Sequence, residues 1–533
     1  MKELEKVLKN QQRGLVKGKR LQDLPAPAEM LNLVPMAQGI IACLDNGQRG
    51  CILGDYDADG VSATSVLKTF FNNIGFGSAM DYKIPDRHAD GYGLSQNIAD
   101  YVLEMEYDFV ITVDNAISAV EPIKFLKENG VSVFLTDHHT TIKRDGVEIL
   151  PPADFVVCPK QEKETFPFIE ISGATVAWYL TAAIVNEWGL EYDLKTGLDM
   201  VAVTVISDVM PVTDINIALL KEGLAQINAK NRRFIWELIV GKDVADETTI
   251  GFKIGPLINA TGRLYNANAL VELFTSRERS DIQKMYTKAH AVNEERKLIS
   301  REMTEKAFEM IDRNKDIIVV SGDFHEGVVG IIAGRLAEAL RRPCIVLAKN
   351  GDIFKGSARS FGNINLYDLI KKSEDLLIGF GGHKGAAGMA IAPDQLKAFE
   401  DSLQVSAKDI PAKDWESVES KPIEVSLSDI NIDMLNLFEK YAPFGLLNPR
   451  PRISVNAEIE ILRDIRKLHW SVIARDNDTQ IKTMFFSVGS NFESYLDDNR
   501  RLTFVADINP HINEITGYKD VQIYGRINEV EED

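Results

Sequence analysis

The sequence predicts a protein of the α/β class, with two α/β domains and a C-terminal β-barrel, and three observations carry this prediction. Short apolar runs alternate with amphipathic stretches from about residue 39 to 209, and a second block of this kind begins at Asp316. Short segments of alternating polarity follow from about Pro422. Buried parallel strands are apolar throughout, whereas half-buried strands alternate. The 533 residues also exceed one hydrophobic core, and the usual domain size predicts about three domains.

The expected boundaries divide the chain into five segments. They are an N-terminal helical extension (1–38), a first α/β domain (39–225), a helical connector (226–315), a second α/β domain (316–405) and a barrel domain (406–533). The connector is predicted because residues 267–314 have helical polarity spacing and contain no Gly or Pro. Five short strands favour an OB-fold for the barrel, since this fold commonly binds single-stranded nucleic acid.

Composition indicates an ordinary globular protein of the cytoplasm. Hydrophobic residues make up 45% and charged residues 26% of the chain, and neither a membrane span nor an apolar signal segment is expected. The scattered Cys43, Cys51, Cys158 and Cys344 predict neither disulfides nor a thiolate zinc site. A net charge of -19 argues against indiscriminate binding to nucleic acid but leaves room for a local basic groove.

Three aspartates follow the first apolar run directly. Asp55, Asp57 and Asp59 come after CILG, and Gly60 is expected to free the backbone to turn into a helix. Alternate carboxylates at a strand end repel each other unless cations lie between them, which favours a hard-metal site. The alternative is an acidic helix N-terminus stabilised by the helix dipole, which explains one aspartate but hardly three.

Further candidate ligands stand at the ends of later apolar runs. Asp114 ends one run and Asp137, His138 and His139 end the next. Taken singly, Asp114 fits a turn and His138 a core imidazole, but parallel strands would bring them to the same sheet edge. Asp208 closes a further apolar strand or helix and is a weak candidate by itself. The mixed oxygen and imidazole set suits Mn²⁺ or Mg²⁺, and two ions about 4 Å apart can act on a phosphodiester.

The second α/β block offers groups that suit a phosphate. Residues 355–360 (KGSARS) and 379–388 (GFGGHKGAAG) are predicted to be small-residue loops, in which Arg359 supplies a bidentate fork and His383 an imidazole. Arg87 and Arg263 are single arginines in predicted turns, where a surface salt bridge is the alternative. In the barrel, basic and aromatic side chains could hold a strand and stack bases, namely Arg466, Lys467, His469 and Trp470, the last equally suited to the core.

The assembled motifs resemble the DHH phosphoesterases, and within them the RecJ-type exonucleases. The resemblance rests on strings that appear in the family's order from about residue 50 to 390 and are very specific. They are GDYDADG, IPDRHADGYGL, VDNAIS, TDHH, ISDVMPV, IGFKIGPLINATGRL, HEGVVGIIAGRL, KGSARS and FGGHKGAAG. EKYAPFGLLNPRP extends the similarity to the segment that leads into the family's OB-fold.

The resemblance implies a DHH catalytic domain and a DHHA1 domain around a cleft, followed by an OB-fold. It implies a 5′→3′ exonuclease specific for single-stranded DNA, which acts in repair and recombination by two-metal-ion catalysis and releases 5′-mononucleotides. Single-stranded DNA is the expected partner, and whether a single-strand-binding protein or a helicase recruits the chain is left open. The implied metal ligands are Asp57, Asp59, Asp114, His138 and Asp208, with Asp55 as a ligand or supporting group. The implied substrate contacts are His139, Arg263 and His383 near the reacting phosphate, and Arg87, Ser357 and Arg359 at the 5′-phosphate.

Two positions depart from the family pattern. Ala116 replaces a glycine, which adds a methyl group where backbone approaches the metal site. Leu53 replaces a histidine found in many members four residues before the first metal-binding aspartate, and this predicts an altered ligand shell.

Two other functions compete with this interpretation. A DHH phosphodiesterase for short oligonucleotides or cyclic dinucleotides would share the α/β domains, but the barrel favours a polymer substrate. A non-catalytic DHH-like scaffold of a replication or repair complex would typically have lost metal ligands, and this chain retains them.

Overall fold

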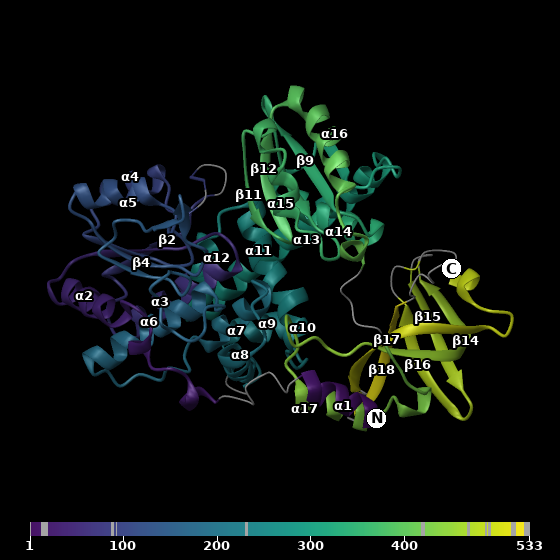
Figure 1. Ribbon diagram of the computed structural model, residues 1–533. Helices are drawn as coiled ribbons and strands as arrows, with labels where there is room; N and C mark the ends of the chain where they lie inside the picture. Colours follow the sequence, from purple (N-terminus) through teal and green to yellow (C-terminus); the bar gives the residue numbers. More distant parts are fainter. Residues whose placement is uncertain are drawn as a thin grey trace.

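The computed structural model contains two α/β domains, a helical connector and a barrel domain (Figure 1). It describes residues 2–11, 20–86, 90–91, 93–229, 233–416, 422–465, 469–485, 488, 492–512 and 519–526. The predicted fold class is therefore confirmed.

The first domain is built on a five-stranded parallel sheet in the order β2-β1-β3-β4-β7. Its strands are β1 (Gly50–Leu53), β2 (Met80–Lys83), β3 (Phe109–Thr112), β4 (Ser132–Thr136) and β7 (Phe155–Val157). A separate hairpin joins β5 (Ile142–Arg144) to β6 (Val147–Ile149). The three apolar runs that precede the candidate ligands are β1, β3 and β4, as predicted, so the ends of three neighbouring strands lie at one sheet edge.

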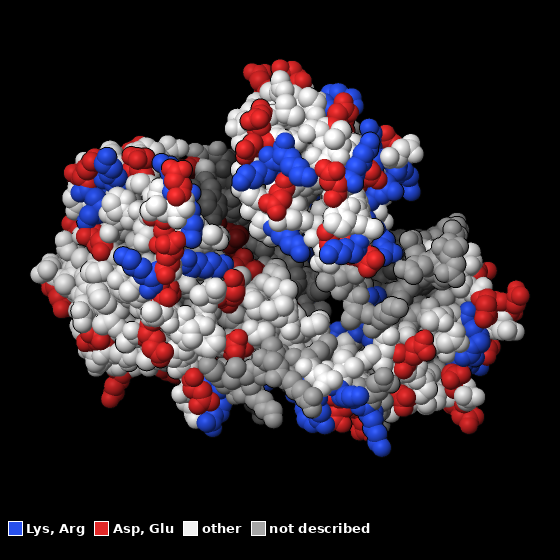
Figure 2. All heavy atoms as spheres, viewed as in Figure 1, with Lys and Arg blue, Asp and Glu red and all other residues white. Residues whose placement is uncertain are grey.

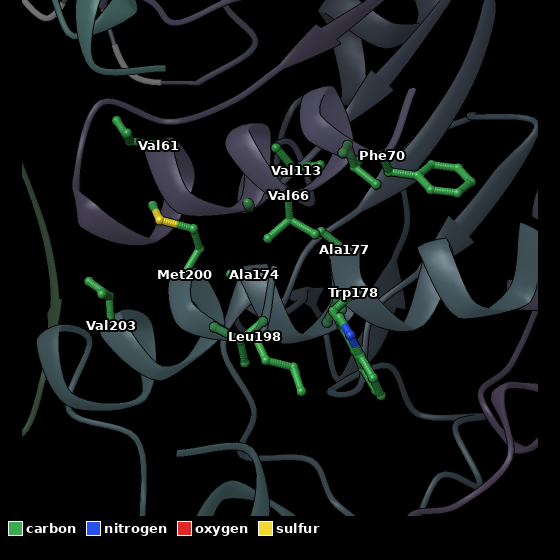
Figure 3. Close-up of a cluster of buried hydrophobic side chains, with 14 of the residues drawn as sticks. Val61, Val66, Phe70, Val113, Ala174, Ala177, Trp178, Leu198, Met200 and Val203 are labelled. Atoms are coloured by element: carbon green, nitrogen blue, oxygen red, sulfur yellow. The ribbon is translucent and has the colours of Figure 1, made fainter. Parts of the chain in front are cut away.

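Helices cover both faces of this sheet because its strands alternate their side chains between two cores. Ile52 and Ile111 face one core, while Cys51 and Val110 face the other. The first core is formed with α2 (Leu33–Asp45), α3 (Ala58–Asn73), α6 (Gly173–Trp188), α7 (Leu198–Ser207) and α8 (Asp214–Ile227). The second lies under α4 (Gln96–Glu104) and α5 (Val120–Glu128). Figure 3 shows Val66 of α3, Ala177 of α6 and Leu198 of α7 within the first core. Their packing fixes the positions of these helices, whose ends border the site.

The connector is a series of helices rather than a single one. Its elements are α9 (Phe234–Val240), α10 (Glu247–Thr249), the π-helical turn η3 (Ile250–Ile254), α11 (Gly255–Leu264), α12 (Asn268–Thr275) and α13 (Arg279–Glu309). At 31 residues, α13 is about 46 Å long and leads into the second domain. Arg263 lies in the last turn of α11, so the prediction that it occupies a turn between elements is wrong.

The second domain has a mixed five-stranded sheet in the order β11-β12-β10-β9-β8. Its strands are β8 (Ile318–Gly322), β9 (Cys344–Asn350), β10 (Ile353–Arg359), β11 (Gly379–His383) and β12 (Ala386–Ile391). Its helices include α14 (Val329–Leu340), α15 (Leu366–Lys371) and α16 (Leu396–Ala407).

The two predicted small-residue loops of this domain are mostly strand. KGSARS forms most of β10, and GFGGHKGAAG forms the hairpin of β11 and β12, so the loop prediction is wrong for both. Close packing explains one of the small residues, because a Cβ at Gly356 would lie 2.5 Å from the carbonyl oxygen of Val346 on β9. Small residues reflect sheet packing here as well as access to a ligand.

The third domain is a closed barrel. Its strands are β14 (Ile453–Ile465), β15 (His469–Asp476), β16 (Thr479–Phe485), β17 (Arg501–Ile512) and β18 (Lys519–Arg526), and β14 pairs with both β15 and β17. The short β13 (Ile423–Glu424) joins β14 from outside, and α17 (Ile432–Tyr441) packs on the barrel core. The N-terminal helix α1 (Lys2–Gln11) belongs to the same core through Leu4 and Leu8 (Figure 1).

Short 3₁₀ turns complete the described elements. They are η1 (Leu21–Asp23), η2 (Pro27–Glu29), η4 (Glu326–Val328), η5 (Glu374–Leu376), η6 (Pro393–Gln395), η7 (Ala412–Trp415), η8 (Leu427–Asp429) and η9 (Phe492–Tyr495).

Two expectations from composition can be compared with this fold. Cys43, Cys51, Cys158 and Cys344 are all buried and free. Within the described ranges, no single helix has the length and apolarity to cross a membrane. One bent pair, Leu21–Glu29 with Leu33–Asp45, meets those criteria jointly, on length and composition alone.

Candidate metal centre

The aspartates that follow β1 lie at the start of α3. Asp57 is the N-cap of this helix, and its carboxylate accepts hydrogen bonds from the backbone N–H groups of Asp59 and Gly60 at 2.9 and 3.1 Å. Gly60 lies inside the helix, where a Cβ would come within 2.4 Å of the Asp55 backbone. Close packing of α3 on this loop, rather than a turn, therefore requires the glycine.

The ends of β3 and β4 bring Asp114 and His138 together. The Nε2 atom of His138 lies 3.1 Å from Oδ1 of Asp114 and 3.5 Å from Oδ2 of Asp59. Asp114 has a φ of 61°, a left-handed conformation that aspartate tolerates better than most residues. The predicted convergence of strand ends is present.

Asp208 reaches the same cluster from a helix. It caps the C-terminus of α7, and its Oδ2 lies 3.6 Å from Nε2 of His138. The sequence left open whether the preceding run is a strand or a helix, and the structure shows a helix.

The cluster divides into two ligand sets that meet at His138 and Asp114. Within each set, one potential ligand atom per residue lies within 4.8 Å of the others. The two sets consist of Asp59, His138 and Asp208, and of Asp55, Asp57 and Asp114. A further set of Asp114, His138 and His139 overlaps both. All of the carboxylates predicted as metal ligands belong to these sets.

The buried polar atoms of the centre fit divalent cations. Nε2 of His138 and Oδ1 of Asp114 are buried, and neither has a hydrogen-bond partner among the described residues. In the tautomer that carries its proton on Nδ1, the Nε2 atom presents a lone pair to the lone pairs of the carboxylate oxygen, and leaving the two face to face in the interior is unfavourable. A cation that binds both atoms removes this cost. Carboxylate and imidazole donors without thiolates suit Mn²⁺ or Mg²⁺.

Burial and mutual repulsion shift the pKa values of the acidic groups upward. Burial and then the charge of Asp57 raise the pKa of Asp59 to about 7. Burial and then the charge of Asp59 raise the pKa of Asp208 to about 8. The pKa values of Asp55 and Asp114 also lie well above the ordinary range, chiefly because of burial. The fold therefore concentrates negative charge that bound cations would neutralise.

The two histidines differ in their surroundings. Burial and the neighbouring His139 lower the pKa of His138 to about 3, so its ring is neutral and can bind a metal. Burial also acts to lower the pKa of His139, but a 2.8 Å hydrogen bond to Asp137 and the charge of that carboxylate raise it to about 9. The side chain of His139 is 46% exposed, so it can contact a ligand.

Helix α6 holds Asp59 of the metal centre through hydrogen bonds from its first turn. The backbone N–H groups of Gly173 and Ala174, in its first turn, donate to the two carboxylate oxygens of Asp59 at 2.6 and 2.8 Å. A Cβ at Gly173 would lie 2.5 Å from Cβ of Asp114. The positive end of the helix dipole thus stabilises Asp59 and holds it beside Asp114.

The two departures from the family pattern have visible consequences. Ala116 has a φ of 86°, a conformation that disfavours any residue with a Cβ, and it is buried. Leu53 is buried in the core under α4 and α5. At this position the chain offers an apolar side chain in place of a ligand.

A cleft of about 660 Å³, which we call the phosphate cleft, adjoins the metal centre. Tyr56, which stands between two of the aspartates, lines it together with Arg263, Ser357 and Arg359. The first residues of α14 also line it, and a Cβ at Gly330 would lie 3.2 Å from the Arg359 guanidinium. Among the described lining residues the acidic one is Glu326, which accepts a hydrogen bond from the side chain of Asn350.

Arg359 gives this cleft an uncompensated positive charge. Its Nη1 donates to Oγ of Ser357 and to the carbonyl oxygen of Ala358, both at 3.0 Å. No ion pair of Arg359 is found among the described residues, and burial lowers the pKa of its guanidinium. A cation in such surroundings is complemented by an anion such as phosphate.

Figure 2 shows the surface hollowed between the first and second domains, with acidic atoms at the base and basic atoms on the second-domain wall.

Other predicted residues are not brought into this cluster. His383 is exposed at the end of β11, where its Nδ1 accepts a hydrogen bond from the Gly385 N–H. Trp470 packs in the barrel core, with its ring 5.3 Å from that of Phe492. His469 begins β15 and is partly buried. Arg87, Arg466 and Lys467 lie outside the described residues.

Two residues position the site in ways that the sequence did not indicate: Asp137 was a candidate without an assigned role, and Asn259 was missed. Asp137 accepts hydrogen bonds from the backbone N–H of Ile117 and from the His139 ring, and its place beside the histidines was the available signal. Asn259 of α11 accepts a hydrogen bond from the backbone N–H of Ala58. Nothing in the local sequence distinguished Asn259, because the contact spans 201 residues.

Comparisons with known proteins agree with this geometry. Residues 49–205 match the N-terminal domain of the DHH family, residues 314–408 the DHHA1 domain and residues 423–526 the RecJ OB domain. Together, the fold and the site define a phosphoesterase of the DHH class.

Individual relatives narrow the class. The single-stranded-DNA-specific exonuclease RecJ of Bacillus subtilis is 32% identical over 94% of this chain, which spans 64% of that relative. RecJ of Dickeya dadantii is 30% identical over 85% of this chain and 80% of its own length. The crystal structure of Thermus thermophilus RecJ in complex with Mn²⁺ matches 94% of this chain and 72% of that chain, with a TM-score of 0.77 at 26% identity. The same protein is also known in complex with Mg²⁺. This chain belongs to the RecJ family.

Proposed function

We propose that this chain is a metal-dependent exonuclease that degrades single-stranded DNA from its 5′ end and releases 5′-mononucleotides in DNA repair and recombination. One observation carries the proposal: two cation-binding ligand sets adjoin a cationic cleft, and Tyr56 links the two. A terminal phosphate in the cleft would therefore hold the next phosphodiester near the metals.

The residues of the centre have distinct roles in this proposal. Two bound divalent cations would supply positive charge to the attacking and the leaving oxygen of the phosphodiester. Asp55, Asp57, Asp59, Asp114, His138 and Asp208 hold them. His139 contacts the scissile phosphate, while Asp137 fixes the orientation of its ring.

The cleft of the second domain sets the polarity of digestion. Ser357 and Arg359 bind the 5′-terminal phosphate, helped by the N-terminus of α14. Arg87 is proposed to complete this pocket. Arg263 lines the cleft between the pocket and the metal centre. His383 is proposed to approach the reacting phosphate from its exposed position at the end of β11.

The remaining parts have roles that follow from the family. Residues 39–225 and 316–405 form the catalytic and phosphate-binding domains, and residues 406–533 hold the strand beyond them. A single-strand-binding protein or a helicase delivers the substrate. The cytoplasm is the proposed location.

Digestion of labelled single strands tests the proposal. Strands with a 5′-phosphate, a 5′-hydroxyl or a blocked 3′ end are incubated with Mn²⁺, beside an Asp57→Ala/Asp59→Ala control. We expect mononucleotides, a preference for the 5′-phosphate, no effect of the 3′ block and no product from the control. A product ladder that runs from the 3′ end would refute the polarity.

A further inference from the structure

An apolar groove lies beside the metal centre, away from the phosphate cleft. It has a volume of about 350 Å³ and is formed by the end of α7, the turn η3 and the segment that leads into the barrel. Its walls include Val209, Phe252, Leu446 and Pro449. It shares no lining residue with the phosphate cleft.

The groove begins one residue from the metal ligands. Val209 directly follows Asp208, and its side chain is 62% exposed. Its φ is 54°, which strains a β-branched residue. A helix usually ends with Gly or Asn at this position, so capping does not explain an exposed valine here. A contact made by the side chain would explain it.

Phe252 supplies an exposed aromatic face to the same groove. It lies on the π-helical turn η3 and is 79% exposed, the highest value among the large hydrophobic side chains described. Such turns occur frequently at functional sites. Exposed aromatic rings are the groups on which proteins stack the bases of single strands.

Helix α11 shows how the groove is placed relative to the phosphate cleft. Its first residue, Gly255, packs against Ser207, next to the metal ligand Asp208. Near its other end, a Cβ at Gly262 would lie 2.0 Å from the carbonyl oxygen of Tyr56. Phe252 before this helix and Arg263 at its end are therefore about 16 Å apart along one helical segment. The groove and the cleft lie at opposite ends of the metal centre.

The groove also continues toward the barrel. The segment between α17 and β14 lies on the first domain, where the backbone N–H of Val212 donates to the carbonyl oxygen of Leu446 at 2.8 Å. Figure 1 shows this segment passing α10 on its way to β14. The described lining residues of the groove include one acid, Glu247, and one guanidinium, Arg450. Its walls thus suit a base better than a phosphate.

We propose that this groove binds the bases of the DNA strand on the 3′ side of the scissile phosphate, with Phe252 as the stacking surface and Val209 in contact with the base or sugar. The inference rests on the proposed exonuclease function and extends it. A strand held by its 5′-phosphate in the cleft would cross the metal centre, enter the groove and leave toward the barrel.

Abasic substrates test this subsite. The full chain with Mn²⁺ is given 5′-phosphorylated single strands that carry one abasic residue at each of the first positions in turn. We expect cleavage to slow by about tenfold when the abasic residue occupies the groove, as loss of one stacked base predicts. Phe252→Ala should cleave the normal strand at this slower rate and show no abasic effect, Phe252→Tyr should restore both, and Val147→Ala serves as an exposed-residue control.

Binding without cleavage separates this inference from the proposed function. Anisotropy of labelled strands in EDTA should show the same tenfold losses for the abasic strand and for Phe252→Ala. Val209→Gly should raise Tm by relieving strain yet weaken strand binding. If no strand is cut but these binding differences appear, the exonuclease proposal fails and the subsite stands. If wild-type protein binds and cuts abasic and normal strands equally at every position, or if Phe252→Ala changes neither, the subsite is refuted.

Discussion

The two α/β domains concentrate opposite charges because their sheets place side chains differently. In the first domain, acidic groups stand beyond the ends of parallel strands, so Asp59 and Asp114 converge on one small volume. In the second domain, Ser357 and Arg359 lie on the antiparallel strand β10, and Arg359 forms no ion pair with a described residue. The carboxylates at converging strand ends repel each other, which favours the binding of cations between them. The guanidinium on the strand face has no acidic partner in the described part of the chain, which favours the binding of an anion.

Removal of one carboxylate from the metal centre of the first domain should have the largest effect of the changes considered. Asp114→Asn keeps the side-chain shape and a residue that tolerates a φ of 61°. It removes the charge of a carboxylate that belongs to one ligand set and lies 3.1 Å from His138 of the other. We expect nuclease activity to fall on the order of a thousandfold and the metal-free protein to become more stable, as measured by digestion and by thermal unfolding. Asp108→Asn, before the start of the same strand, is the matched control; equal losses in both variants would contradict the account.

Replacement of the isolated guanidinium tests the second domain's side. Arg359→Lys keeps the charge but loses the bidentate fork, so the preference for a 5′-phosphate over a 5′-hydroxyl should fall about tenfold to a hundredfold. Manganese binding should not change, because the metal ligands lie in the other domain. Competition between 5′-phosphorylated and 5′-hydroxyl single-stranded DNA measures the preference. Lys349→Ala on the neighbouring strand β9 is the control. An unchanged preference would remove Arg359 from the pocket.

The acidic convergence should also make the metal-free protein sensitive to alkaline pH. The pKa values of Asp59 (about 7), Asp208 (about 8) and His139 (about 9) are all higher than in an unfolded chain. The folded protein therefore holds protons that the unfolded chain releases, and its free energy of unfolding should fall as pH rises from 6.5 to 9. Below pH 6.5 the lowered pKa of His138 acts in the opposite direction.

Thermal unfolding in EDTA measures this pH dependence. Tm should drop across the window, Mn²⁺ should restore it increasingly as the carboxyls ionise, and Asp208→Asn should flatten the slope. A Tm that rises with pH in EDTA would contradict the electrostatic argument.

The smallest expected effect is on the free energy of unfolding and concerns the backbone at Ala116, two residues after Asp114. A buried Ala→Gly substitution normally destabilises a protein, by about 1 kcal/mol in a helix. At Ala116, relief of the strained φ of 86° should offset this loss and leave the free energy of unfolding within about 0.5 kcal/mol of the original. Ala99→Gly in α4, buried in the same core, should show the full loss in denaturant unfolding. Equal losses at both positions would show that Ala116 is unstrained.

Sequence patterns predicted the parts of this site that depend on local structure. Asp57, Asp114 and His138 each follow an apolar run, and a buried parallel strand places whatever follows it at the sheet edge. The fold class follows from the same periodicity, so both domains and the barrel could be predicted.

Features that depend on packing could not be predicted in this way. The segment KGSARS was predicted to be a loop because its small residues suit loops as well as tightly packed strands, and only the neighbouring β9 shows why Gly356 must lack a Cβ. Asn259 and Gly173 reach the centre from helices far along the chain. The exposure of Phe252 depends on how the turn η3 meets the segment between α17 and β14. The hydrophobic periodicity of the sequence does not indicate such a contact.

Anomalous diffraction from crystals soaked in Mn²⁺ tests the central claim most directly. The account predicts two manganese peaks per chain, one bound by Asp59, His138 and Asp208 and the other by Asp55, Asp57 and Asp114. A structure in which these side chains bind no manganese, or in which the ions lie elsewhere, would contradict it.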